Sequence, residues 1–116
     1  MKIRIYETLK NMFTRNREIK QGNIDHETAK RILKNDKDAV LVDVRSPQEY
    51  KEKHLDGSIN IPVYEIEQKS KEIIPNKNNV YILYCQSGGR SSKAVKILEK
   101  QRYSKLYNIE GGLDNI

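Results

Sequence analysis

The chain contains one cysteine, Cys85, which opens the segment CQSGGRS at residues 85–91. A cysteine reacts as its thiolate, and an ordinary thiol pKa of about 8.5 leaves only a few per cent of the side chain ionised at neutral pH. If Cys85 is a nucleophile, its surroundings must therefore stabilise the anion. The residues that follow it are of types that can do so.

The segment after Cys85 has the composition of an anion-binding loop. Gly88 and Gly89 permit the positive φ values that turn successive backbone amides inward. A helix predicted from Ser91 onward adds the amides of its first turn, and Arg90 adds a positive charge. We therefore expect a loop that holds a thiolate, an anionic substrate or a bound persulfide. The alternative is that Cys85 is a small buried apolar residue, the commonest role of a lone cysteine.

Regular elements that alternate in type surround this loop. Apolar, β-branched runs predict strands at residues 39–44 and 80–84, and shorter strands are expected at 58–62 and near 105–109. Helical spacing and capping residues predict helices at 24–35, with Asp25 as cap, at 46–54, with Ser46 as cap and Pro47 in the first turn, and at 63–74 and 91–101.

Strands that alternate with helices indicate an α/β domain with a mainly parallel sheet and right-handed crossovers. The functional site of such a sheet lies beyond the carboxyl ends of its strands. Cys85 directly follows the predicted strand at 80–84, which places it at that edge.

The length and composition narrow the class of protein. A chain of 116 residues fits one domain with a core of its own, and a single cysteine excludes an internal disulfide. His26 and His54 lie too far apart for a metal-ligand spacing, and His26 is expected to be exposed, so no metal or cofactor is predicted. The absence of a long apolar run and of a signal peptide predicts a cytoplasmic protein.

The positive charge is concentrated near the N-terminus. The net charge is +6; residues 1–22 hold six basic and two acidic side chains, a net +4, which leaves +2 for the rest. We predict a basic N-terminal extension at 1–22 and one domain at 23–116. This uneven distribution does not favour nucleic acid as a ligand.

Residues 2–15 form an amphipathic pattern within that extension. Drawn as a helix, the segment gathers its apolar side chains on one face, although the alternation at residues 3–5 also fits a short strand. We expect this helical extension to pack on the domain itself or on a second copy. Binding to a partner protein and contact with a membrane surface are the less favoured alternatives.

Two long segments resemble a known family, the rhodanese homology domain in its short single-domain form. Residues 41–62, LVDVRSPQEYKEKHLDGSINIP, resemble its first signature, and residues 80–112, from VYILYCQSGGRSS to GG, resemble its active-site and carboxyl-terminal signatures. The resemblance covers roughly residues 24–113. It implies a five-stranded parallel sheet flanked by helices and a rhodanese-type sulfurtransferase. By position, the persulfide-forming nucleophile is Cys85, and the loop that binds the persulfide or the substrate consists of Gln86, Ser87, Gly88, Gly89, Arg90 and Ser91.

The resemblance also implies a reaction by double displacement, with a small sulfur donor and an external acceptor. Because the chain has no second cysteine, the acceptor must be a separate thiol, or cyanide in an assay. Asp43 and Arg45 are expected to support the loop mainly as architecture, in a charge network with Glu49. Many family members carry a basic residue directly after the cysteine, where this chain has the neutral Gln86. A polysulfide or a persulfide is therefore as well supported a donor as thiosulfate.

Two other functions remain open. A persulfide carrier or sensor for a partner protein would need the same loop without rapid turnover of small donors. A cysteine phosphatase or arsenate reductase also places a cysteine before an arginine. Those phosphatases have five intervening residues, whereas four separate Cys85 from Arg90, and a phosphate ester further requires an acid for its leaving group.

Overall fold

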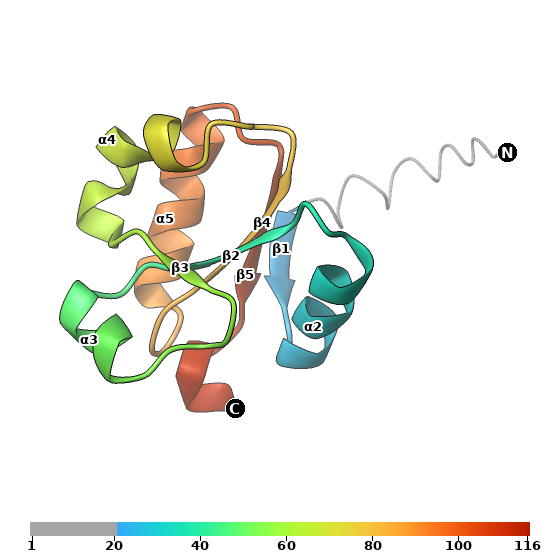
Figure 1. The fold of residues 1–116 in the computed structure, drawn as a ribbon, viewed down its shortest axis with the longest axis vertical. Coiled ribbons are helices and arrows are strands. Elements are labelled where there is room, and N and C mark those ends of the chain that lie inside the picture. The colour runs from blue at the N-terminus through green and yellow to red at the C-terminus, as the bar shows by residue number, and fades with distance from the viewer. Residues whose placement is uncertain (1–20) are drawn as a thin grey trace, which may run out of the picture.

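The computed structural model describes residues 21–116, which form a five-stranded sheet with helices on both faces (Figure 1). The predicted amphipathic segment at residues 2–15 lies outside the described residues, as does the extension at 1–22 apart from its last two residues. The strands are β1 (Gln21–Ile24), β2 (Val40–Asp43), β3 (Ile59–Asn60), β4 (Val80–Tyr84) and β5 (Lys105–Ile109). The helices are α2 (His26–Asn35), α3 (Pro47–Glu52), α4 (Val63–Ile73), α5 (Gly89–Lys100) and the 3-10 helix η1 (Gly112–Asn115).

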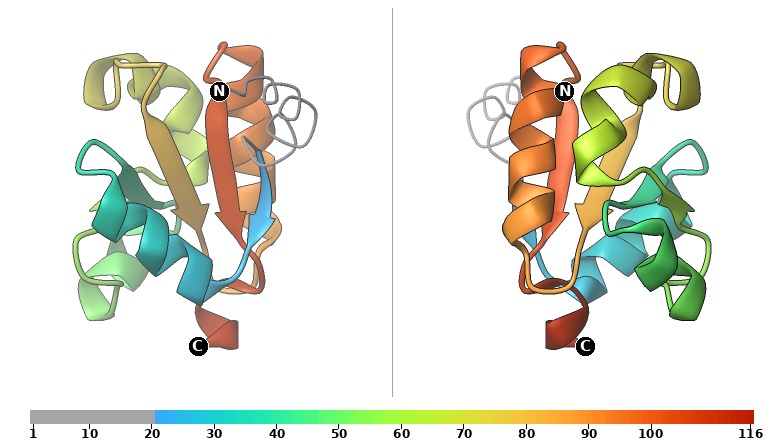
Figure 2. Two further views of the ribbon diagram at one scale, coloured as in Figure 1. Left: turned by 90° about the vertical axis from the view of Figure 1, so that its right-hand side faces the viewer. Right: turned by 90° about the vertical axis from the view of Figure 1, so that its left-hand side faces the viewer.

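The sheet has the strand order β1-β5-β4-β2-β3, and every neighbouring pair is parallel. Figure 2 shows the arrowheads of β1, β4 and β5 pointing the same way. The prediction of a mainly parallel sheet is thus sharpened to an all-parallel one. All carboxyl ends consequently lie at one edge of the sheet, where the 3-10 helix η1 also lies.

The first strand, β1, was not predicted from the sequence. Strand β1, with the sequence QGNI, begins at Gln21 and pairs with β5 along one edge of the sheet. Its single isoleucine provides neither an apolar run nor an alternating pattern, so local sequence did not reveal it. Residues 21–24 form a strand because β5 provides their backbone hydrogen-bond partners.

The helix starts follow the predicted caps. The Asp25 carboxylate accepts the amide of Thr28 at the start of α2. Ser46 and Glu49 form a reciprocal capping box at the start of α3, with Pro47 in its first turn. Within residues 21–116, no helix has both the length and the apolar character needed to cross a membrane.

Helices α4 and α5 cover one face of the sheet, and α2 covers the other (Figure 1). Strand β4 alternates between these two cores. Tyr81 and Leu83 belong to the core under α4 and α5, whereas Ile82 and Tyr84 belong to the core under α2. Cys85 continues the alternation and joins the core of α4 and α5. Its side chain is thereby directed to the face on which α5 begins.

Candidate active site

The register of the sheet brings two loops together at the carboxyl edge. Asp43, the last residue of β2, is aligned with Tyr84, the last residue of β4. The amide of Val44 then donates to the carbonyl of Tyr84 at 3.1 Å. The chain that continues from β2 through Val44 and Arg45 therefore lies beside the loop that begins with Cys85.

The Cys85 sulfur accepts hydrogen bonds from the loop and from the first turn of α5. The backbone amide of Gly88 donates to Sγ at 3.1 Å, and that of Ser91 donates at 3.4 Å. The Ser91 hydroxyl lies 3.4 Å from the same sulfur. Only 1% of Cys85 is exposed. The loop and helix thus form a cradle of donors around a buried sulfur atom.

This cradle favours the thiolate. Burial opposes ionisation, but hydrogen bonds from the Ser91 hydroxyl and from the amides of Ser91, Gly88 and Ser87 outweigh it and hold the pKa of Cys85 below its ordinary value. The Ser91 hydroxyl also lies 3.2 Å from the carbonyl of Gly88. Because a hydroxyl carries one hydrogen, it can donate to that carbonyl beside a neutral thiol and rotate toward the sulfur when the thiol ionises.

The two glycines of the loop differ, contrary to expectation. Gly88 has a φ of +112° and makes the turn that directs its amide at the sulfur. Gly89 does not adopt a positive φ, because it is already the first residue of α5, two residues before the predicted start. One glycine therefore makes the turn, and the other begins the helix.

Arg90 is placed beside the loop but is occupied by a carboxylate. Its Nη1 and Nη2 donate to the two carboxylate oxygens of Glu49 at 2.7 and 3.1 Å. Among the described residues Glu49 makes its ion pair with Arg90 and not with Arg45, so the expected charge network consists of two neighbouring pairs. The capping box at the start of α3 holds Glu49 toward Arg90 instead, through the amide of Ser46.

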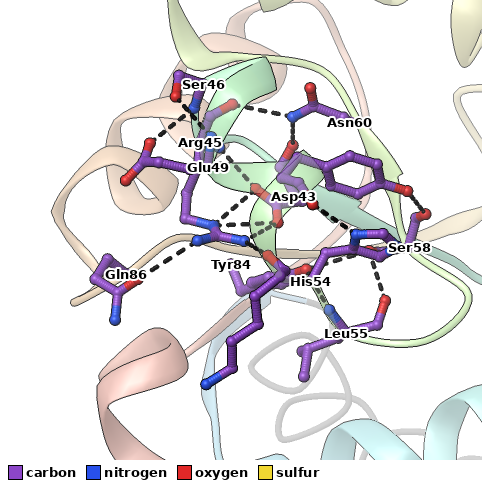
Figure 3. A network of polar contacts seen from close by, with 12 residues as sticks. Asp43, Arg45, Ser46, Glu49, His54, Leu55, Ser58, Asn60, Tyr84 and Gln86 are labelled. Atoms are coloured by element: carbon purple, nitrogen blue, oxygen red, sulfur yellow. Dashed lines mark hydrogen bonds and ion pairs between the residues drawn. The ribbon is translucent and has the colours of Figure 1, made fainter.

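Asp43 and Arg45 form a separate, buried ion pair (Figure 3). One Asp43 oxygen accepts the Arg45 amide at 2.8 Å, and the other accepts its Nη2 at 2.9 Å. Arg45 Nη2 also donates to the carbonyl of Lys53, and Nη1 lies 3.5 Å from the Gln86 side-chain oxygen. Asn60 donates to the carbonyls of both Asp43 and Arg45. Side-chain and backbone groups of these two residues thus link β2 to β3, to the residue after α3 and to Gln86 of the cysteine loop.

Tyr84 precedes the nucleophile but faces the opposite core. Its oxygen accepts the amide of Leu55 at 2.9 Å and lies 3.1 Å from the Ser58 hydroxyl (Figure 3). Burial raises the pKa of Tyr84 to about 12. It therefore remains a neutral hydroxyl at physiological pH and holds the segment at 55–58 in place.

The C-terminal turn supports the loop from a direction that sequence reasoning missed. The amides of Leu113 and Asp114 donate to the carbonyls of Cys85 and Gln86 at 3.0 and 2.9 Å. Gly112 has a φ of +55°, and a Cβ there would collide with the Cys85 carbonyl. The only local signal was the Gly-Gly pair after the last predicted strand, which did not reveal what it contacts.

His26 also contributes to this support. Its Nε2 lies 2.8 Å from the carbonyl of Gly112, and the residue is half-buried. The expectation that His26 is simply exposed was therefore wrong, because α2 begins against the C-terminal turn. Across residues 21–116, His, Cys, Asp and Glu side chains do not gather in groups of three that could hold a metal ion.

Comparisons with known proteins agree with this geometry. The model of the rhodanese-like domain matches residues 25–116. Thiosulfate sulfurtransferase PspE of Escherichia coli is 37% identical over 75 residues, which cover 65% of this chain and 71% of that protein. A sulfurtransferase of Allochromatium vinosum is 33% identical over 92 residues, covering 79% of this chain and 84% of that protein. A solved structure described as rhodanese with anions from E. coli has a TM-score of 0.62 at 36% identity and covers 67% of this chain and 91% of its own. With its all-parallel sheet and its cysteine cradle at the carboxyl edge, the chain belongs to the rhodanese-like domain family.

Proposed function

We propose that this protein is a sulfurtransferase that carries a sulfane sulfur as a persulfide on Cys85. The observation that carries the proposal is the cradle of Gly88 and Ser91 donors around the buried sulfur. Two proteins similar to this chain are named sulfurtransferases, one of them a thiosulfate sulfurtransferase. We propose further that the donor is thiosulfate, a polysulfide or a persulfide, and that the acceptor is an external thiol, or cyanide in an assay.

In the first half of the reaction, the Cys85 thiolate attacks the outer sulfur of the donor. With thiosulfate, a bond forms between Sγ and that outer sulfur, the sulfur–sulfur bond of the donor breaks, and sulfite leaves with the electron pair. The product is a Cys85 persulfide anion. Its charge is centred on the outer sulfur, one bond beyond Sγ, and we expect the amide donors of the same loop to stabilise it there.

In the second half, an external nucleophile attacks the terminal sulfur of the persulfide. The bond between the two sulfur atoms breaks, and Cys85 recovers its electron pair as the thiolate. Cyanide would give thiocyanate, and a thiolate would give a new persulfide. Because Cys85 is the only cysteine of the chain, an internal disulfide cannot release the sulfur.

A persulfide carrier or sensor is the second candidate. It is favoured by the burial of Cys85 and by the neutral Gln86, which offers a doubly charged donor no cation. The phosphatase alternative receives less support. The guanidinium of Arg90, which a phosphate would need as a two-pronged donor, already binds the Glu49 carboxylate in that way.

The test combines a turnover assay with intact-mass measurement. The protein is incubated with thiosulfate and cyanide while thiocyanate is followed, and separately with thiosulfate or polysulfide alone before its mass is determined. Cys85→Ser is the inactive variant, and Ser104→Ala, an exposed serine before β5, is the matched control. Turnover that depends on Cys85 supports the enzyme. A stable gain of one sulfur without turnover supports the carrier, and no gain from either donor refutes both.

A further inference from the structure

The side chain directly after the nucleophile is held by groups of opposite charge. The Gln86 amide nitrogen donates to the Asp114 carboxylate at 2.7 Å, and its amide oxygen lies 3.5 Å from Nη1 of Arg45. Asp114 itself is anchored, because its backbone amide donates to the Gln86 carbonyl at 2.9 Å. Two contacts to one loop residue therefore keep the Asp114 carboxylate at the beginning of the cysteine loop.

The arginines that reach this loop cannot balance that carboxylate. Arg45 is paired with Asp43, and Arg90 is paired with Glu49. In the part of the chain that the structure describes, Asp114 has no ion-pair partner and its side chain is exposed. These five charged side chains sum to −1, since two positive charges meet three negative ones. An anionic molecule that approaches Cys85 therefore meets a negative charge beside the loop.

We infer that Asp114 is a specificity-determining residue that disfavours highly charged anionic donors at Cys85. This inference rests on the proposed function and concerns the choice of donor. The Asp114 carboxylate repels an approaching anion electrostatically. Its hydrogen bond with Gln86 also holds that neutral amide in place beside Cys85. The residue selects for donors with a smaller total charge, such as a thiol persulfide with a single negative charge, over the thiosulfate dianion.

The size of the effect follows from Coulomb's law. One unit of donor charge at about 8 Å from a carboxylate, in a partly hydrated site with an effective dielectric constant of about 40, changes the rate of encounter and binding by about fivefold. When the carboxylate is neutralised, the rate of encounter and binding should therefore rise about five times more for a donor with two negative charges than for a donor with one. High salt should diminish this difference, because the Debye length falls to about 3 Å at 1 M.

Asp114→Asn tests this, because asparagine can still accept the Gln86 amide while it loses the charge. The assay compares kcat/KM for thiosulfate, a dianion, with kcat/KM for methanethiosulfonate, a monoanion. In both donors the thiolate takes the outer sulfur, and sulfite or methanesulfinate leaves with the electron pair of the broken sulfur–sulfur bond. We expect Asp114→Asn to raise the ratio of thiosulfate to methanethiosulfonate about fivefold. Asp114→Glu, which restores the charge, should return the ratio toward that of the wild type.

A second measurement does not depend on sulfur transfer. The rates of alkylation of Cys85 by iodoacetate and by neutral iodoacetamide also differ by one unit of reagent charge, so Asp114→Asn should raise their ratio by about the same factor. Glu99→Gln is the matched control: it removes an equal charge near the far end of α5, about 15 Å along the helix from its start, and should change neither ratio.

The outcomes separate the inference from the proposed function. Ratios that Asp114→Asn leaves unchanged, or that Glu99→Gln changes equally, would overturn the role of Asp114. If the alkylation ratio shifts as expected but neither donor adds sulfur to Cys85, the proposed function fails, while the electrostatic action of Asp114 on the cysteine is supported. Thermal unfolding of each variant verifies that the comparison is made between folded proteins.

Discussion

Asparagine in place of Asp43 should destabilise the fold strongly, because it leaves a buried guanidinium without its counter-charge. Asp43 is fully buried and Arg45 is 3% exposed. The substitution keeps the size of the side chain but places an amide donor where two carboxylate oxygens accept from Arg45. Removal of one partner from a buried pair costs about 3–5 kcal/mol. Arg45 would retain its contacts to Lys53 and Gln86, which favours the lower end, about 3 kcal/mol.

Urea unfolding followed by circular dichroism measures this loss. The free energies of unfolding can be compared directly if the slope of free energy against urea concentration is the same in both proteins. For a domain of this size, a loss of about 3 kcal/mol corresponds to a fall in Tm of about 12–24 °C. The double variant Asp43→Asn/Arg45→Met, which removes both charges, should be more stable than Asp43→Asn alone, because no unpaired charge remains buried.

An exposed ion pair provides the matched control for this experiment. Glu65 and Lys69 lie 3.7 Å apart on α4, with side chains 38% and 52% exposed. Glu65→Gln removes the same kind of charge but should cost less than about 1 kcal/mol, because solvent screens the pair. If Asp43→Asn lowers the free energy of unfolding no more than Glu65→Gln does, burial does not make the Asp43–Arg45 pair more important for stability than an exposed pair.

Three further predictions concern the loop and its supports. Hydrogen bonding to its arginine partner lowers the pKa of Glu49 from 4.5 to about 2, so its stabilising effect is present above about pH 4.5 and is lost as the pH falls toward 2. About a third of this side chain is exposed, so solvent weakens the effect. Between pH 5 and 2.5, the free energy of unfolding in urea should fall by only about 1 kcal/mol more for the wild type than for Glu49→Gln. Parallel pH profiles of the two proteins would contradict this. Ser91→Ala removes the hydroxyl that lowers the pKa of Cys85, so the pH profile of iodoacetamide alkylation should move to higher pH, and an unmoved profile would exclude a role for this hydroxyl. Gly88→Ala should cost about 1–3 kcal/mol, because alanine is strained at a φ of +112°, whereas Gly89→Ala, whose Cβ meets nothing within 4 Å, should be tolerated; equal losses of stability would refute the distinction.

The sequence alone was sufficient to predict the features that depend on neighbours in the chain. The helix cap at Ser46, the apolar run of β4 and the composition of the loop after Cys85 each follow from residues within a few positions of one another. Caps, apolar runs and turn residues act locally, and their patterns therefore survive as sequence signals. The type and order of most elements, and the place of the candidate nucleophile, were predictable for this reason.

Tertiary structure alone decided which side chains surround that nucleophile. Glu49 meets Arg90 across 41 residues, and His26 meets Gly112 across 86. Strand β1 is a strand because β5 lies beside it, and Asp114 reaches Gln86 because the last turn folds back onto the carboxyl edge. These contacts depend on strand register and on the closure of distant loops, which no local pattern encodes. The sequence could therefore identify the sulfur atom, while the charges that an approaching donor would meet became visible only in the folded chain.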